Sequence, residues 1–199
     1  MNQSKKLTIP DLISIGVFTA IYFVLVTIAT FGSALLIPGF STILLPAIVA
    51  LISGSVYMLM VAKLQKFGGI TTFGVVMGLF FFVSGHFALS FVANIVCGVV
   101  ADFIAKASDY KSKKGILLSY VVFSYGLTGP ILPLWFMKDA YVAQLIAKGK
   151  DSVYIDSLFS NINMGTFAIC MISILVLAVI GGVFGQKMLK KHFVKAGIV

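Results

Sequence analysis

The sequence contains no arginine and no glutamate, and only 11% of its 199 residues carry a charge. In soluble domains about a quarter of the residues are charged. A chain that is 60% hydrophobic and so poor in charge is not an ordinary soluble domain. Its composition, with a mean hydropathy of +1.09, indicates that most of it is in contact with lipid.

Several catalytic signatures are also missing. The glycine-rich segment 181–187 lacks the spacing of a Walker A loop and its final serine or threonine, so we expect no ATP hydrolysis by that route. The motifs G-x-S-x-G, C-x-x-C and H-E-x-x-H do not occur, and no paired carboxylates suit acid and base chemistry. These absences disfavour an intramembrane enzyme.

The few acidic and thiol side chains give no ion-coupling or metal site. Asp11, Asp102 and Asp139 lie near the ends of apolar runs, and Asp102 is spaced to pair with Lys106 one helical turn on. A proton relay or sodium site would need a carboxylate inside the membrane. Cys97 and Cys170 fall within apolar runs as small packing residues, so we predict no disulfide, no metal and no cofactor.

What the sequence does have is a series of long apolar runs. A bilayer core needs about 20 apolar residues per helix. The runs are continuous and do not alternate with polar residues, which disfavours a β-barrel. Backbone groups in lipid must then be hydrogen-bonded within helices. We predict an all-α membrane protein, a single domain over residues 1–199. Its six transmembrane helices are expected at 12–31, 41–62, 70–85, 87–106, 115–136 and 164–187.

The lysines predict the orientation. With the amino terminus inside, twelve lysines fall on the cytoplasmic side and three outside, which follows the positive-inside rule. We therefore place both termini in the cytoplasm of a prokaryote, with the chain in the plasma membrane. The net charge of +9 then reflects topology and contact with anionic membrane lipid, not nucleic acid. The inner lysines are Lys5, Lys6, Lys63, Lys66, Lys106, Lys111, Lys113, Lys114, Lys187, Lys190, Lys191 and Lys195, and the outer ones are Lys138, Lys148 and Lys150.

Small residues recur at four-residue spacing, which lets helix backbones approach closely. For Gly74 with Gly78 and for Gly181 with Gly185, we interpret the spacing as packing inside the bundle. For Gly16 and Ala20 on the first helix, two interpretations stay open: internal packing, or a smooth face for a partner subunit.

Polar residues gather toward the outer ends of the later helices. His86, Ser90 and Asn94 are four apart, so they form one helical stripe about 12 Å long at 1.5 Å per residue. A polar stripe in lipid must face inward. It either bonds another helix, as Asn94 alone would, or lines a ligand pocket that opens outward.

The fifth run adds further candidates. Tyr125 precedes Gly129 and Pro130, and proline interrupts helical hydrogen bonding. Carbonyl groups freed in this way are tolerated only beside protein or water, which again indicates a cavity at the outer end. Trp135 either belongs to the aromatic belt at the interface or stacks on a flat ligand. The candidate site also includes Asp139, in the long connection 137–163, and Asn163, at the start of the last helix. The amphipathic part of this connection, 140–147, either lies along the interface or caps a cavity.

At this point the chain resembles a known family, the substrate-binding S components of energy-coupling-factor (ECF) transporters, and within it the Trep_Strep type that includes HmpT-like proteins. The residues that carry the resemblance are 6–13 (KLTIPDLI), 57–59 with Lys63, 84–87 (SGHF), 110–114 (YKSKK), 133–135 (PLW) with 138–141 (KDAY), and the tail 190–199 (KKHFVKAGIV).

The resemblance implies a subunit that captures a water-soluble vitamin or precursor, here hydroxymethylpyrimidine or a pyridoxine-like compound. It implies docking on a module of one transmembrane T component and two ATPases, through small residues that match Gly16 and Ala20, and a whole-body tilt during transport. The candidate contacts are His86, Ser90, Asn94, Tyr125, Trp135, Asp139 and Asn163. The alternatives are a stand-alone secondary transporter, which would need internal repeats or a coupling carboxylate, and an intramembrane enzyme.

Overall fold

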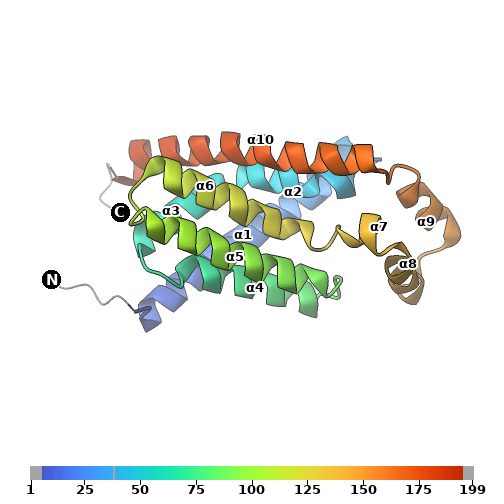
Figure 1. Cartoon of the computed structure of the whole chain (residues 1–199), viewed down its shortest axis with the longest axis horizontal. Helices are drawn as coiled ribbons and strands as arrows, with labels where there is room; N and C mark the ends of the chain where they lie inside the picture. The colour runs from blue at the N-terminus through green and yellow to red at the C-terminus, as the bar shows by residue number, and fades with distance from the viewer. Residues whose placement is uncertain (1–5, 38, 195–199) are drawn as a thin grey trace.

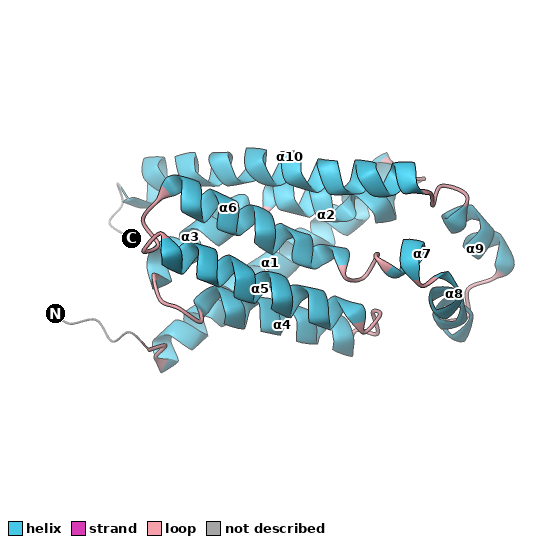
Figure 2. Cartoon of the chain, in the orientation of Figure 1, coloured by secondary structure: helices cyan, strands magenta, loops and turns pink. Residues whose placement is uncertain are grey.

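The computed structural model describes residues 6–37 and 39–194, so Lys5 and Lys195 of the predicted inner lysines lie outside the described residues. Every regular element in these ranges is helical (Figure 2). The elements are α1 (Ile9–Leu36), α2 (Ser41–Ile52), α3 (Gly54–Leu64), α4 (Gly69–Val83), α5 (Leu89–Ala107), α6 (Lys113–Ser124), the 3-10 turn η1 (Tyr125–Thr128), α7 (Pro133–Phe136), α8 (Lys138–Ala147), α9 (Ser152–Phe159), α10 (Met164–Met188) and the π-helical turn η2 (Leu189–Val194).

The long helices form one elongated bundle (Figure 1). The chain runs along it in alternating directions through α1, the pair α2 and α3, then α4, α5, α6 and α10. The start of α1 and the end of α10 lie at the same end, which we call the lysine-rich end, and α7, α8 and α9 lie at the opposite end, which we call the α8 end.

Three helices are long and apolar enough to cross a membrane: α1, α5, and α10 with its continuation to His192. The pair α2 and α3 makes a fourth candidate, bent by 48°. The expected helix over 41–62 is therefore broken, and the expected helix over 115–136 is wrong as a single element, because α6 ends at Ser124. The expected helix over 70–85 is the 15-residue α4, about 22 Å long.

The apolar surface fits a membrane protein. Side chains such as Leu35 and Val83 are each 82% exposed, and Phe31 is 73% exposed. Contiguous apolar surface on this scale is rare in soluble monomers, so lipid is the environment that these helices require.

Glycines set the closest helix crossings. A Cβ atom on Gly74 would lie 2.5 Å from the carbonyl oxygen of Asn94, so α4 and α5 touch backbone to backbone. On α10, Gly181 and Gly185 lie directly against the break between α2 and α3 at Gly54. The predicted packing role of both glycine pairs is confirmed.

The centre of the bundle is a buried group of aromatic rings, which we call the aromatic core: Tyr22, Tyr57, Phe73, Tyr120 and Phe123. Ring centroids lie 4.9 Å apart for Phe73 and Phe123 and 5.1 Å apart for Tyr57 and Phe123.

Hydroxyl groups tie this core to the surrounding helices. The Tyr57 hydroxyl lies 2.6 Å from Ser119 Oγ, which donates to the carbonyl of Ala101. The Tyr120 hydroxyl lies 3.0 Å from Ser53 Oγ at the α2–α3 break. These bonds satisfy polar groups that lipid or apolar protein would leave unpaired.

A buried carboxylate organises the lysine-rich end. Asp102 accepts hydrogen bonds from the backbone N–H groups of Gly68 (2.8 Å) and Thr71 (3.0 Å), and from the hydroxyls of Thr71 and Tyr110 (3.0 Å each). The expected pairing of Asp102 with Lys106 is wrong: the Lys106 ammonium instead lies 4.6 Å from the ring centroid of Phe67. The N–H groups at the start of α4 have no partner within the helix, and they bind the Asp102 carboxylate more favourably than the solvated ammonium of Lys106 would.

Candidate functional site

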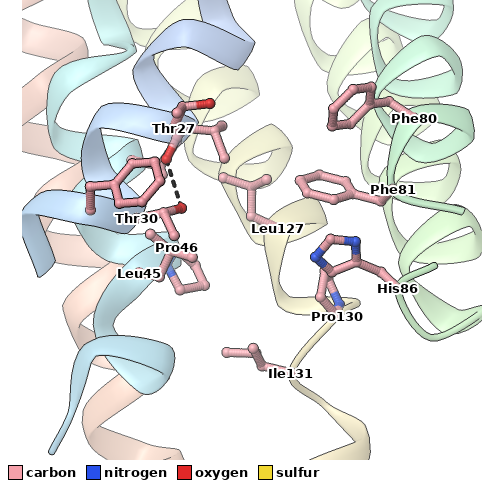
Figure 3. A pocket seen from close by; sticks show the side chains of 13 residues that line it. Thr27, Thr30, Leu45, Pro46, Phe80, Phe81, His86, Leu127, Pro130 and Ile131 are labelled. Atoms are coloured by element: carbon pink, nitrogen blue, oxygen red, sulfur yellow. Dashed lines mark hydrogen bonds between the residues drawn. The ribbon is translucent and has the colours of Figure 1, made fainter. Parts of the chain in front are cut away.

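An open cavity of about 340 Å³ lies toward the α8 end of the bundle (Figure 3). Its walls come from the second half of α1, the middle of α2, the end of α4 with the connection after it, and η1 with the segment that follows. Most of its lining side chains are apolar, with a buried floor and an exposed mouth. The lining residues are Val26, Thr27, Thr30, Phe31, Leu45, Pro46, Val49, Phe80, Phe81, His86, Leu127, Pro130 and Ile131.

The local sequence explains why a cavity forms here. Pro130 has no N–H group and cannot continue a helix, so the helical path of α6 gives way to the 3-10 turn η1 and then to an irregular segment. The predicted interruption of the helix is confirmed, and a cavity lies beside it. Pro130 and Ile131 lie on one side of the hollow, and Leu45 and Pro46 of α2 lie across from them in Figure 3.

The cavity offers very little free polarity. The Thr27 and Thr30 hydroxyls donate to the carbonyls of Phe23 (2.9 Å) and Val26 (2.8 Å) on their own helix. The imidazole of His86 is therefore the lining group best placed to hydrogen-bond a ligand. It stands at the mouth, edge-on to Phe81, with ring centroids 5.0 Å apart.

The surroundings of His86 favour its neutral form. Partial burial of the ring, and then the positive charge of Lys148, lower the pKa of His86, while the carbonyl of Phe81 partly opposes them. A neutral imidazole carries one donor nitrogen and one acceptor nitrogen. The site can therefore bind a neutral ligand that both donates and accepts.

Helix α8 is fastened beside this mouth. Gln144 Nε2 and Lys148 Nζ both donate to the carbonyl of Gly85, at 3.1 and 2.5 Å. Gly85 adopts a φ of +78°, a conformation that favours glycine. The predicted amphipathic segment 140–147 is thus part of a real helix that lies next to His86.

Ser90 and Asn94 face inward as predicted, but they do not line the cavity. Ser90 Oγ donates to the carbonyl of Phe87 (2.7 Å), and Asn94 Nδ2 donates to the carbonyl of Ser90 (2.8 Å). Asn94 is 3% exposed and packs directly on Gly126 of η1. This stripe therefore serves helix packing, and only His86 of the three reaches the hollow.

The remaining candidates lie apart from the cavity lining. The Tyr125 hydroxyl donates to the carbonyl of Met171 (2.9 Å), and Trp135 Nε1 donates to the carbonyl of Asn163 (2.9 Å). Asn163 caps α10, its side chain accepting from the N–H of Thr166 (3.0 Å). Asp139 is exposed in the first turn of α8. The structure does not bring these four together with His86, and their roles in binding stay predictions.

Sequence reasoning missed the aromatic lining. Phe80 and Phe81 belong to an unbroken run of phenylalanines in which every residue has the same apolar character. Phe81 is 6% exposed and Phe80 is 48% exposed, so the two rings serve the floor and the mouth respectively. They differ from lipid-facing neighbours because α4 packs on α1 and faces α2 across the cavity.

Gly16 and Ala20 are both exposed on α1. A Cβ atom on Gly16 would meet no atom within 4 Å. Internal packing, one of the two interpretations left open, therefore does not explain this pair among the described residues.

These features define the class: an all-helical integral membrane protein with an open cavity near one end of its bundle. The described residues hold no group of three His, Cys, Asp or Glu side chains suited to a metal ion. In comparison with known proteins, residues 9–195 match the family described as hypothetical bacterial integral membrane protein (Trep_Strep). The chain belongs to this family. No curated protein and no solved structure matches it.

Proposed function

We propose that this protein is the S component of an ECF-type importer, which captures a small water-soluble vitamin or precursor in the cavity beside His86. In this proposal the α8 end faces outward, six segments cross the plasma membrane, and both termini are cytoplasmic. The observation that carries it is the open, aromatic-lined cavity of about 340 Å³ at one end of the bundle.

The distribution of lysines supports this orientation. Most of the described lysines lie at the lysine-rich end, in the last turns of α3, α5 and α10, in the connections that follow α3 and α5, at the start of α6 and in η2. Lys138, Lys148 and Lys150 lie at the α8 end. Such an imbalance follows the positive-inside rule if the α8 end is outside.

The cavity fits a flat ring with few polar edges. A pyrimidine or pyridine ring, as in hydroxymethylpyrimidine or pyridoxine, would pack against Phe81 and Phe80 and hydrogen-bond to the neutral imidazole of His86. In this proposal the stacking surface lies on α4, and not on Trp135 or Tyr125. The hydroxymethyl group of either compound can reach water at the open mouth.

Calorimetry with the purified protein and a panel of vitamins tests the ligand. We expect heat with hydroxymethylpyrimidine or pyridoxine, and His86→Ala should weaken binding up to about tenfold, the loss of one hydrogen bond. His192→Ala removes the other described histidine, which is exposed at the lysine-rich end, and should leave binding unchanged. No heat with any pyrimidine or pyridine would discard this ligand class.

The free face of α1 is proposed to dock the T component, with the two ATPases supplying energy. Gly16→Leu with Ala20→Leu should abolish copurification of the T component and ATPases while ligand binding persists. Ala168→Leu, a small exposed position on α10, is the matched control and should copurify normally.

Reconstitution separates this proposal from the alternatives. A stand-alone secondary transporter would accumulate substrate in vesicles that contain this chain alone. An S component should do so only with the T component and ATPases present. An intramembrane enzyme would convert the bound compound, which mass spectrometry of the recovered ligand would reveal.

A further inference from the structure

A second hollow lies at the lysine-rich end, lined by residues of α3, α6, α10, η2 and the connection between α5 and α6. Figure 1 shows these helices side by side at that end. The hollow has a volume of about 320 Å³, and we call it the lysine groove. Its floor and walls include apolar side chains, and its rim carries three lysines. The lining residues are Met58, Ala62, Gln65, Tyr110, Lys111, Lys113, Ile116, Gln186, Leu189 and Lys190.

The neutral donors in this groove already serve the protein itself. Gln65 Nε2 donates to the carbonyl of Ala62 (3.0 Å), Gln186 Nε2 to the carbonyl of Lys113 (2.7 Å), and the Tyr110 hydroxyl to Asp102 (3.0 Å). Apart from the second N–H of each glutamine amide, the donors that remain for an external acceptor are the lysine ammonium groups, and these are the charged ones.

Those ammonium groups lack an acidic partner in the part of the chain that the structure describes. The ion pair found there joins Lys66 to Asp11, outside the groove. Lys111, Lys113 and Lys190 are all exposed. Three cations around an apolar floor complement an anionic amphiphile, since a soluble anion would gain nothing from the floor.

The backbone at this end is also unusual. The non-glycine residues with positive φ in the described chain are Gln65, Asp109 and Tyr110, and two of them line the groove. Such conformations persist only where the surrounding structure holds them, and they often mark binding sites.

We propose that the lysine groove binds the phosphate headgroup of an anionic phospholipid such as phosphatidylglycerol, with its glycerol and upper acyl chain against Met58, Ile116 and Leu189. The groove lies where α6 begins and α10 ends, so it is at headgroup level in any orientation that places these helices across the bilayer. Basic pockets between transmembrane helices bind anionic headgroups in this way. The site does not depend on the proposed transport function.

Native mass spectrometry of the full chain in mild detergent tests the proposal. Phosphatidylglycerol should bind at least tenfold more tightly than phosphatidylcholine with the same acyl chains. Replacing the three rim lysines together, Lys111→Gln, Lys113→Gln and Lys190→Gln, should weaken binding roughly a hundredfold, at about fivefold for each lysine near a membrane surface. The corresponding triple Lys→Arg variant should bind as the native protein does.

Lys114, Lys187 and Lys191 provide the charge-matched control, because they lie at the same end but outside the groove lining. Their triple Lys→Gln variant should retain binding. Equal loss in both triple variants would overturn the site in favour of diffuse surface charge. Two results on the unaltered protein would also overturn it: no preference for phosphatidylglycerol, or glycerol 3-phosphate binding as tightly as the lipid.

Discussion

Replacing Gly185 by alanine should loosen the contact between α10 and the broken helix pair. The new Cβ atom would lie 2.6 Å from the carbonyl carbon and oxygen of Gly54 and 2.8 Å from the Ser55 nitrogen. These are backbone atoms, which cannot rotate away, so the cost lies near the upper end of overpacking, about 3 kcal/mol. The higher helix propensity of alanine returns about 1 kcal/mol.

The matched control is Gly16→Ala, the same chemical change where the new Cβ meets no atom within 4 Å. There alanine should stabilise the protein by about 0.5 to 1 kcal/mol. At about 2 to 4 °C per kcal/mol for a chain of this size, Gly185→Ala should lower the melting temperature by about 4 to 8 °C, and Gly16→Ala should raise it slightly.

The protein carries a suitable reporter for this measurement. Cys170 is 0% exposed in α10, so a thiol-reactive fluorogenic dye reaches it only when the bundle opens. A Cys97→Ala background removes the half-buried second thiol. If Gly185→Ala melts at or above the temperature of Gly16→Ala, the close approach of α10 to Gly54 is wrong.

Three further predictions concern the two ends of the bundle. Burial and Lys148 lower the pKa of His86, so ligand affinity measured by calorimetry should stay constant from pH 8 to about 6.5 and decrease at more acidic pH, below the ordinary histidine range. His86→Gln should remove this decrease. A decrease that persists in His86→Gln would refute the assignment. Asp102→Ala leaves four hydrogen-bond donors without their acceptor. It should lower stability in thermal unfolding by about 1 to 3 kcal/mol for each donor that stays buried, whereas Asp156→Ala, at an exposed position, should cost little. Equal stability would contradict the buried role of Asp102. Lys148→Met with Gln144→Leu should speed amide hydrogen exchange in α8, because the pair removes both side-chain bonds to the Gly85 carbonyl, and unchanged exchange would show that this contact does not hold the helix.

Much of the fold could be predicted from the sequence because lipid imposes strong rules. Hydropathy located the long helices α1, α5 and α10, and residue spacing identified the packing glycines of α4 and α10. The break at Ser53 and Gly54 was not visible, since neither residue forces a bend. It depends on Tyr120 and on the two glycines of α10, which come from distant parts of the chain.

The candidate site was predictable only in part, for a related reason. Pro130 predicted an irregular segment, and His86 was a candidate because it is a histidine in a tight connection. Asn94 looked equally suited to a pocket, but its side-chain amide bonds the carbonyl of Ser90 on its own helix, and Gly126 of η1 closes over it. Whether a buried amide meets a ligand or another helix depends on how closely a neighbouring backbone approaches, and the sequence of one helix does not contain that information.

Under the proposed function, in which the α8 end faces outward, the aromatic core has a consequence for the path of a transported compound. Tyr22, Tyr57, Phe73 and Tyr120 are each 0% exposed, and they fill the interior between the cavity near one end and the groove at the other. The packed rings of the aromatic core thus block the inward path of a compound bound beside His86. To cross this chain along its axis, it would have to part helices whose backbones already touch at glycine, so a route along the outside of the bundle, with the subunit itself changing position, is the less costly path.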